Sequence, residues 1–310
     1  MSENKSFEEL FIVDQGVDSL KKKELNIIFL SDIHESFNYL EKLKEWQMKH
    51  KILFDYLLCG GDFLSLKNEE QSNSNTVFKS EGIMSSILNY LECICLNVVY
   101  IPGNHDPYTL FNLKSPKLTV RSTNIHSKFF QLDKDLFLFG FGGSIPAFPS
   151  KLNVSDCNLY EEIDYENNVY SGYPFEGNYK ISDEKLFEGF KKGWEDSKNQ
   201  LESEKQVLKQ VILLTHLGPF YSQTTINQEF NKYIYMGSKY LDNFIKKSDN
   251  ILLDLHGHTH DGEGMTTVGK VKVINPGTFL KGNFSIVKLK RNYNNEWKLE
   301  KLEIINLDFN

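Results

Sequence analysis

Five short apolar segments of this chain each run into a turn that carries Asp, Asn or His. They cover residues 26–31, 54–60, 97–101, 211–215 and 251–255. Short, continuous apolar runs of this kind are typical of strands that are buried on both faces. In open α/β sheets, ligands bind at the carboxyl ends of the strands. The pattern therefore predicts an α/β fold with a functional site where these strands end.

The polar residues behind these segments are of the types that bind metals or move protons. They are Asp32 and His34, Asp62, Asn104 and His105, His216, and His258 and His260. An Asp-x-His or Gly-Asp pair alone carries little information, but Gly-Asn-His-Asp at 103–106 is rare by chance. The two histidines of Gly-His-Thr-His at 257–260 project the same way in extended backbone. We therefore expect these side chains to converge on one site.

Between the predicted strands, apolar residues recur at helical spacing. The periodic apolar residues are Phe37, Leu40, Leu43 and Trp46, then Ile83, Ile87, Leu91 and Ile94, then Phe187, Phe190, Trp194 and Leu201. They predict a helix after residue 36 and buried helix faces over about 80–95 and over 184–204. Ser238 is expected to cap a further helix around residues 240–245.

The remaining segments are less regular. Short strands are expected near 118–120 and over 135–141, residues 221–236 show no regular pattern, and residues 268–308 alternate like an antiparallel β-meander. The polar stretch at 148–182 lacks periodicity, which predicts a long surface insertion that could cap the site. Residues 1–24 are expected to form an N-terminal extension before a single domain at 25–310.

Composition argues against several classes of function. The formal net charge is −7, and no basic stripe runs along the chain. Proteins that grip a nucleic-acid backbone are usually basic, so we expect no stable nucleic-acid binding. The N-terminus lacks the apolar core of a signal peptide, and no apolar run approaches membrane-spanning length. The four cysteines form no Cys-x-x-Cys pair. We therefore expect a soluble cytoplasmic protein with reduced thiols and no membrane contact.

Arginine is scarce, and this bears on the chemistry. Only Arg121 and Arg291 occur among 35 basic residues, although arginine is the usual bidentate clamp for phosphate. Metal ions could supply the missing charge, because two cations about 3.5–4 Å apart can hold both a hydroxide and the oxygens of an anionic phosphoester. Such a pair needs a carboxylate that reaches both ions, together with neutral imidazoles. The mixed nitrogen and oxygen donors suit Mn, Fe, Zn or Ni rather than Ca.

The ordered motifs resemble those of the calcineurin-like metallophosphoesterase superfamily. The motifs are Asp-Ile-His at 32–34, Gly-Gly-Asp at 60–62, Gly-Asn-His-Asp at 103–106, Leu-Thr-His at 214–216 and Gly-His-Thr-His at 257–260. The resemblance spans about residues 26–280, and the stretches at 140–148, 236–245 and 274–278 are similar to small single-domain members. It implies a four-layer α/β/β/α sandwich with two mixed sheets. It also implies hydrolysis of a small-molecule phosphoester by a hydroxide that bridges two divalent or trivalent metal ions.

The resemblance also implies a role for each motif residue. Asp32, His34 and His260 would hold one ion, Asn104, His216 and His258 the other, and Asp62 would bridge both. His105 would assist the leaving group rather than bind metal. Asp106 is expected either to orient His105 or to stabilise a turn, and both roles remain open at this point. His256 is expected to support the metal ligands or to pack in the core. His50 and His126 are expected to be structural or to lie on the surface.

Two departures from the family pattern narrow the activity. The protein Ser/Thr phosphatases continue the second motif as GDxVDRG and end the third in Glu, whereas here Phe-Leu-Ser-Leu follows Asp62 and the third motif ends in Asp106. The sequence is closer to the branch that includes cyclic-nucleotide and other small phosphodiesterases, with monoesters still open. Two alternatives remain. A non-catalytic scaffold on this fold would typically lack a ligand or the proton donor, and a nuclease would be expected to carry more positive charge.

Overall fold

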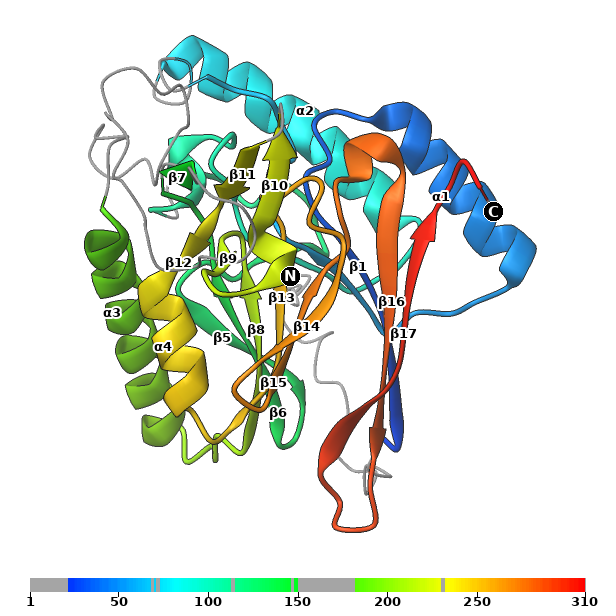
Figure 1. The fold of residues 1–310 in the computed structure, drawn as a ribbon. Helices are drawn as coiled ribbons and strands as arrows, with labels where there is room; N and C mark the ends of the chain where they lie inside the picture. The colour runs from blue at the N-terminus through cyan, green and yellow to red at the C-terminus, as the bar shows by residue number, and fades with distance from the viewer. Residues whose placement is uncertain are drawn as a thin grey trace, which may run out of the picture.

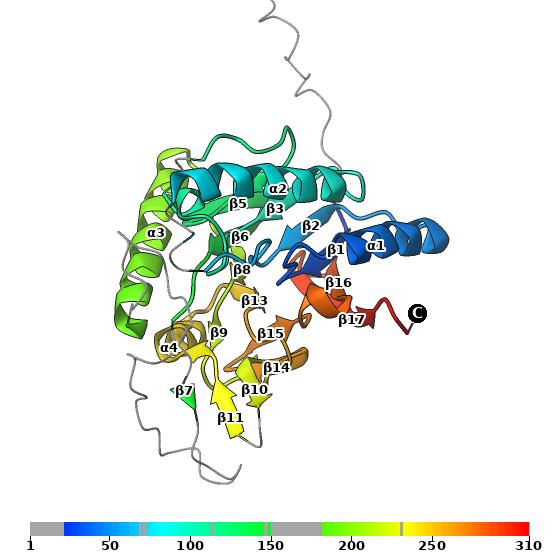
Figure 2. The same ribbon diagram turned by 90° about the horizontal axis from the view of Figure 1, so that it is seen from above.

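The computed structural model describes residues 22–67, 70, 73–112, 115–145, 148–149, 182–229 and 232–309. Within these residues, two six-stranded mixed sheets face each other, and helices cover the outer face of each sheet (Figure 1, Figure 2). This arrangement confirms the predicted α/β class and the four-layer α/β/β/α sandwich.

The first sheet has the strand order β17-β16-β1-β2-β3-β4. Its parallel strands are β1 (Glu24–Leu30), β2 (Tyr56–Cys59), β3 (Val98–Tyr100) and β4 (Thr123–Asn124), and its antiparallel strands are β16 (Asn283–Arg291) and β17 (Trp297–Asn306). Helix α1 (Phe37–His50) follows β1, and α2 (Ser74–Glu92) follows β2. Both helices lie on the outer face of this sheet (Figure 2).

The second sheet has the order β14-β15-β13-β8-β6-β5. Its parallel strands are β6 (Leu136–Phe141), β8 (Gln210–Thr215), β13 (Ile251–His256) and β15 (Val271–Asn275), flanked by the antiparallel strands β5 (Lys128–Asp133) and β14 (Gly264–Val268). Helices α3 (Asp183–Ser203) and α4 (Lys239–Lys247) cover its outer face (Figure 1). The Ser238 hydroxyl accepts a hydrogen bond from the Leu241 amide, so the predicted cap of α4 is confirmed.

Successive side chains of a strand point to opposite faces of its sheet and so pack into different layers of the core. In β1, Ile28 and Leu30 pack with α1 and α2, whereas Ile27 and Phe29 join a central core between the two sheets. Strand β8 alternates in the same way, with Val211 and Leu213 against α3 and α4 and Ile212 and Leu214 in the central core. Strands buried on both faces have no polar side, which explains why their sequence reads as a continuous apolar run.

Smaller elements lie near the carboxyl ends of the strands (Figure 1). One small sheet joins β10 (Ile226–Glu229), β11 (Lys232–Tyr235) and β7 (Phe148–Pro149), and a second joins β9 (Gly218–Pro219) to β12 (Gly237–Ser238). Short 3₁₀ helices occupy Tyr108–Leu110, Gln223–Thr225 and Phe279–Lys281. The prediction that residues 221–236 are irregular is therefore wrong, because this segment contains a 3₁₀ turn and the β10–β11 hairpin.

The strand expected near 118–120 lies instead at Thr123–Asn124. The Glu92 carboxylate accepts hydrogen bonds from the backbone amides of Arg121 and Ser122. These bonds hold Arg121 and Ser122 against Glu92, and the pairing with β3 begins only at Thr123. The other main strands lie within one or two residues of their predicted positions.

The predicted meander at 268–308 is only partly correct. The hairpin β14–β15 belongs to the second sheet and the hairpin β16–β17 to the first. The chain crosses between the sheets from Asn275 to Asn283, through the Pro276-Gly277 turn and a 3₁₀ helix. Two antiparallel hairpins and a four-stranded meander have the same alternation, so the pattern alone could not separate them.

Two residues of the predicted helix faces are not buried. Phe37 and Ile83 are each 40% exposed. In α2 the buried stripe runs through Met84, Ile87 and Leu91 rather than through Ile83. Most of the insertion expected at 148–182, like most of the expected extension at 1–24, lies outside the described residues. Across the described part of the chain, no helix has both the length and the apolar character needed to cross a bilayer.

Candidate metal centre

The carboxyl ends of strands from both sheets bring the predicted residues together. Asp32 and His34 follow β1, Asp62 follows β2, Asn104 and His105 follow β3, His216 follows β8, and His258 and His260 follow β13. The donor atoms of Asp32, His34 and His260 lie within 4.8 Å of one another, and those of Asp62, His216 and His258 do the same. We name these sets the open group and the buried group, because His34 and His260 are partly exposed.

The open group directs acceptor atoms at a common point. The Nε2 atoms of His34 and His260 are 3.3 Å apart, and His260 Nε2 lies 3.4 Å from Asp32 Oδ1. His34 Nδ1–H donates to the carbonyl oxygen of Leu64 at 3.0 Å, so Nε2 is the ring atom that carries the lone pair. A histidine that ligates a metal is usually fixed by such a hydrogen bond from its other ring nitrogen.

The buried group has the same arrangement. His216 Nδ1–H donates to the Gly60 carbonyl oxygen at 2.7 Å, and His216 Nε2 faces Asn104 Oδ1 at 2.8 Å and Asp62 Oδ2 at 3.2 Å. The Nε2 atom of His258 is buried, with no hydrogen-bond partner within the described part of the chain. A buried polar nitrogen without a partner is costly, and a cation would satisfy it.

The two groups adjoin each other. The His258 amide donates to both oxygens of Asp32, at 3.2 and 3.0 Å, so one residue of each group is in direct contact. The His216 and His258 rings are 5.1 Å apart, and so are the rings of His34 and His260. Carboxylate, amide and imidazole acceptors that converge in this way fit cations with a preference for mixed nitrogen and oxygen donors. Each group could therefore hold one such ion.

The pKa shifts within the cluster indicate that its buried carboxylates are stabilised by nearby positive charge. Burial raises the pKa of Asp62, but the imidazoles of His216 and His105 outweigh it and hold that pKa well below its usual range. Burial raises the pKa of Asp32, but the hydrogen bond from His260 outweighs it and lowers that pKa to about 2. Burial lowers the pKa of His216, yet Asp62 raises it to about 9. A cation bound to the same carboxylates would take the place of the proton on His216.

The ligand-type residues adopt an unusual backbone conformation. Asp32, His34, Asp62 and His258 have φ values of 55°, 45°, 52° and 64°, in the left-handed region. Few non-glycine residues adopt this region, and those that do cluster at functional sites, where the surrounding structure imposes the strain. Here the strain turns each side chain out of the line of its strand and into the cluster.

Glycine allows the loops behind β2 and β3 to approach closely. A Cβ atom on Gly103 would lie 2.1 Å from Asp62 Oδ1, and Gly61 has a φ of 99°. Neither position can accept a larger residue without displacing the Asp62 loop. The Gly-Gly-Asp and Gly-Asn-His motifs therefore have a structural reason as well as a chemical one.

His105 lies beside the open group but is held by other contacts. Its ring centroid is 5.6 Å from that of His34, and its Nδ1–H donates to the Leu66 carbonyl oxygen at 2.9 Å. The expectation that Asp106 orients His105 is not met. Both carboxylate oxygens of Asp106 accept hydrogen bonds from backbone amides, and none of its described contacts reaches the His105 ring. Burial raises the pKa of Asp106 to about 8, and the negative charge of Asp62 adds to this rise, against the effect of these amides. A cation bound at Asp62 would cancel that second contribution and favour the carboxylate form of Asp106.

The other histidines have structural partners. His256 is buried, accepts a hydrogen bond from the Thr224 hydroxyl at 2.7 Å and donates to the Gly257 carbonyl oxygen. His126 is buried and accepts from the Gly142 amide, and burial lowers its pKa to about 3. His50 bonds the Trp46 carbonyl within α1.

Sequence analysis missed two residues that support the ligand loops. The Asn275 amide group donates to the Thr259 and Thr224 carbonyl oxygens, at 2.8 and 3.0 Å. The Thr278 hydroxyl donates to the Asp32 carbonyl oxygen at 2.9 Å. Both residues lie in the Ile-Asn-Pro-Gly-Thr stretch, where the Pro-Gly pair indicates only a turn. Nothing local reveals that this turn braces the Asp32 and Thr259 loops.

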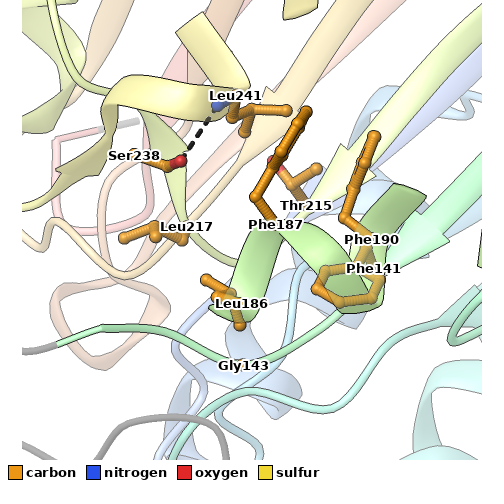
Figure 3. Close-up of a pocket in the computed structure, with 9 residues that line it drawn as sticks. All are labelled: Phe141, Gly143, Leu186, Phe187, Phe190, Thr215, Leu217, Ser238 and Leu241. Atoms are coloured by element: carbon orange, nitrogen blue, oxygen red, sulfur yellow. Dashed lines mark hydrogen bonds between the residues drawn. The ribbon is translucent and has the colours of Figure 1, made fainter. Parts of the chain in front are cut away.

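A cavity of about 20 Å³ lies between α3, α4 and the second sheet. Figure 3 shows Phe187 and Phe190 of α3, Leu241 of α4 and Thr215 around it. That volume holds about one water molecule, so this apolar space cannot take a substrate. Thr215 directly precedes His216 and donates a hydrogen bond to the buried Asp254 carboxylate at 3.2 Å.

Comparison with known proteins agrees with the site. The model of the calcineurin-like phosphoesterase family matches residues 25–262, and the chain belongs to that family. The members depend on metals, in accord with the two donor groups. None of the curated proteins matches the chain closely enough to count as a relative.

Solved structures show the same fold at low sequence identity. The protein TT1561 of Thermus thermophilus is 18% identical with a TM-score of 0.53, and the match covers 91% of this chain and 99% of that one. A dimetal phosphatase from Danio rerio is 12% identical with a TM-score of 0.52, covering 92% of this chain and 100% of that one. At these identities the likeness shows the fold alone.

Proposed function

We propose that this protein hydrolyses small-molecule phosphoesters with two metal ions at the adjacent donor groups. Asp32, His34 and His260 would hold one ion, Asn104, His216 and His258 the other, and Asp62 both. When bound, a pair of such ions supplies a nucleophile at neutral pH and stabilises negative charge on the phosphoryl oxygens. The observation that carries the proposal is the convergence of acceptor atoms, including the orphan Nε2 of His258.

His105 is the proposed proton donor to the leaving oxygen. Its Nδ1–H is committed to the Leu66 carbonyl oxygen, so Nε2 is the atom that can hold and release a proton. The amide of His105 donates to Asp62 Oδ1 at 2.7 Å, which fixes its backbone to the buried group. Proton transfer would thus take place at a defined distance from the phosphoryl group.

The arginines support a preference for diesters. Arg291 is buried in ion pairs with Asp133 and Asp135, and its side chain is 4% exposed. Arg121 precedes β4, which is parallel to β3, and therefore lies at the opposite edge of the sheet from the site. Neither can clamp a phosphate. A monoester dianion has more charge to neutralise than a diester monoanion, so the site suits diesters better.

The donors also support treating residues 25–310 as one domain. Asp62 and Asn104 come from the first sheet and His216 and His258 from the second. The buried group exists only when both sheets are folded together. We propose that neither half of the chain would bind metal alone.

The test is Asp62→Asn in the full chain, with Asp254→Asn as the matched control. Asp254 is another fully buried carboxyl group, but it lies outside both donor groups. Asp62→Asn should lose metal and lower kcat/KM for a bis-aryl phosphodiester by about 10³-fold, whereas the control should retain both. Metal content would be measured by elemental analysis, and activity in Mn, Fe, Zn and Ni. If metal and hydrolysis both survive Asp62→Asn, the two-metal proposal is wrong.

The same assay separates the alternatives. The panel should include aryl monoesters, cyclic nucleotides, phosphopeptides and duplex DNA. Turnover of none of these in any metal, together with tight binding of a protein partner, would favour a scaffold. Salt-dependent binding and cleavage of DNA would favour a nuclease.

A further inference from the structure

We infer that Asp106 is a positioning residue whose carboxylate ties the loop that carries Asp62 to the loop that carries Asn104 and His105. In doing so it would set the geometry of the buried group. This inference rests on the proposed function, because it assigns a role to Asp106 only if that group binds a metal ion. It assigns no contact between Asp106 and a substrate.

Three backbone amides from two loops meet at this carboxylate. Oδ1 accepts from Phe63 at 2.9 Å and from Leu64 at 3.1 Å, directly after Asp62. Oδ2 accepts from Gly103 at 2.8 Å, directly before Asn104. The side chain is fully buried, so water cannot replace these bonds. This side chain therefore joins the backbone directly after Asp62 to the backbone directly before Asn104.

Three further hydrogen bonds join the same two loops. The His105 amide donates to Asp62 Oδ1, the Leu66 amide donates to the His105 carbonyl oxygen at 3.2 Å, and His105 Nδ1–H donates to the Leu66 carbonyl oxygen. Asp62 and Asp106 thus each accept from the loop that carries the other. The proposed bridging ligand and the proposed proton donor therefore lie in two loops that several hydrogen bonds join, and Asp106 accepts those from Phe63 and Leu64 without using a proposed ligand atom.

A carboxylate fits this place better than an amide. It has two acceptor oxygens for three donors, whereas one end of an asparagine side chain is itself a donor. In Asp106→Asn, an NH₂ group would face either one or two backbone N–H groups. The loops would have to separate, and this would move Asp62 and Asn104 relative to His216, which lies on the other sheet.

The experiment compares Asp106→Asn with Asp183→Asn. Asp183 is the matched control because its carboxylate also joins two segments, accepting from the Ser238 hydroxyl and the Lys239 amide, and it belongs to neither donor group. Calorimetric titration of the metal-free full chains with Mn²⁺ would measure each binding step. We expect Asp106→Asn to weaken one of the two steps by about 10- to 100-fold and Asp183→Asn to weaken neither. Both variants should unfold at lower temperature than the wild type.

The outcomes are distinguishable. If the wild type binds no Mn²⁺, the proposed function fails. If the wild type binds two ions and Asp106→Asn binds them with unchanged affinity, the inference about Asp106 is overturned and the proposed function stands. Should Asp106→Asn fail to fold, amide hydrogen exchange on the metal-free wild type replaces it. The amides of Phe63, Leu64 and Gly103 should exchange slowly, and exchange at the rate of open loops would overturn the inference.

Discussion

The open and buried groups are built from the same residue types but differ in their access to water. Each contains one buried aspartate and two histidines. In the buried group, Asp62, His216 and His258 are 1%, 0% and 6% exposed, whereas the His260 side chain of the open group is 37% exposed. Burial removes water as an alternative ligand and strengthens each electrostatic contact. The buried group is therefore suited to retain an ion and the open group to exchange one.

The difference follows from the positions of the ligands along the chain. His216 directly follows β8 and Asp62 lies three residues beyond the end of β2, in the middle of the two sheets, where layers cover them on both sides. His34 and His260 lie one turn further out, in loops that face solvent. The same motif, Gly-His-Thr-His, supplies His258 to one group and His260 to the other.

The largest expected effect is that of metal removal, and it tests the comparison directly. Chelation with EDTA should abolish hydrolysis, because the proposed mechanism uses both ions. The ion of the open group should leave first, so activity should vanish when about half of the metal is lost. Timed samples would be analysed for metal content and for diester hydrolysis. Loss of both ions in one step would contradict the distinction between the groups.

A substitution at His105 should affect chemistry without affecting either ion. His105→Asn is expected to lower kcat by about 10²- to 10⁴-fold while metal content stays at the wild-type level. The loss should be smaller for esters with an aryl leaving group, which needs less help from a proton, than for alkyl esters. His50→Asn, a histidine of α1, is the control. An equal loss on both ester types would rule out proton donation by His105.

Matched substitutions in the two groups should differ in their effect on metal affinity. His258→Asn is expected to weaken Mn²⁺ binding at least about tenfold more than His260→Asn, a difference of about 1.4 kcal/mol. The reason is that water can take the place of the His260 imidazole but cannot reach the place of His258. Calorimetric titration would measure both variants. Equal losses would show that burial does not distinguish the groups.

The smallest effect on activity is expected at Asp254, a buried carboxyl group that no metal would neutralise. Burial raises its pKa to about 7, partly offset by the Thr215 hydroxyl. The folded state therefore holds the proton more tightly than the unfolded state, so its contribution to stability falls as pH rises from about 4 to about 7. Asp254→Asn should remove this decline and leave hydrolysis unchanged. Thermal unfolding at pH 5 and pH 8 would measure it, and a pH-independent difference would contradict it.

The sequence predicted what depends on local pattern. Apolar runs located the strands, and the polar residue behind each run marked Asp32, Asp62 and His216 as candidate site residues, since ligands bind where such strands end. Asp32 and Asp62 follow strands of one sheet and His216 a strand of the other. The sandwich came from the family resemblance rather than from periodicity.

What the sequence could not predict depends on contacts between distant residues. Two of the three amides that bind Asp106 lie 43 and 42 residues earlier in the chain, so its role in joining loops could not be distinguished from contact with the adjacent His105. The Glu92 carboxylate binds amides 29 and 30 residues later, directly before the strand at Thr123–Asn124. Neither set of contacts produces a periodic pattern in the sequence.

The left-handed backbone of four ligand-type residues affects how this protein tolerates change. Aspartate and histidine are among the few residues that enter that region readily, so metal chemistry and main-chain geometry select the same side chains at Asp32, His34, Asp62 and His258. An alanine there would alter two properties at once, and a valine or isoleucine would add steric conflict. Glycine would relax the loop while deleting the donor. These positions therefore tolerate few replacements, because each one changes the loop conformation and deletes a metal-type donor in the same step.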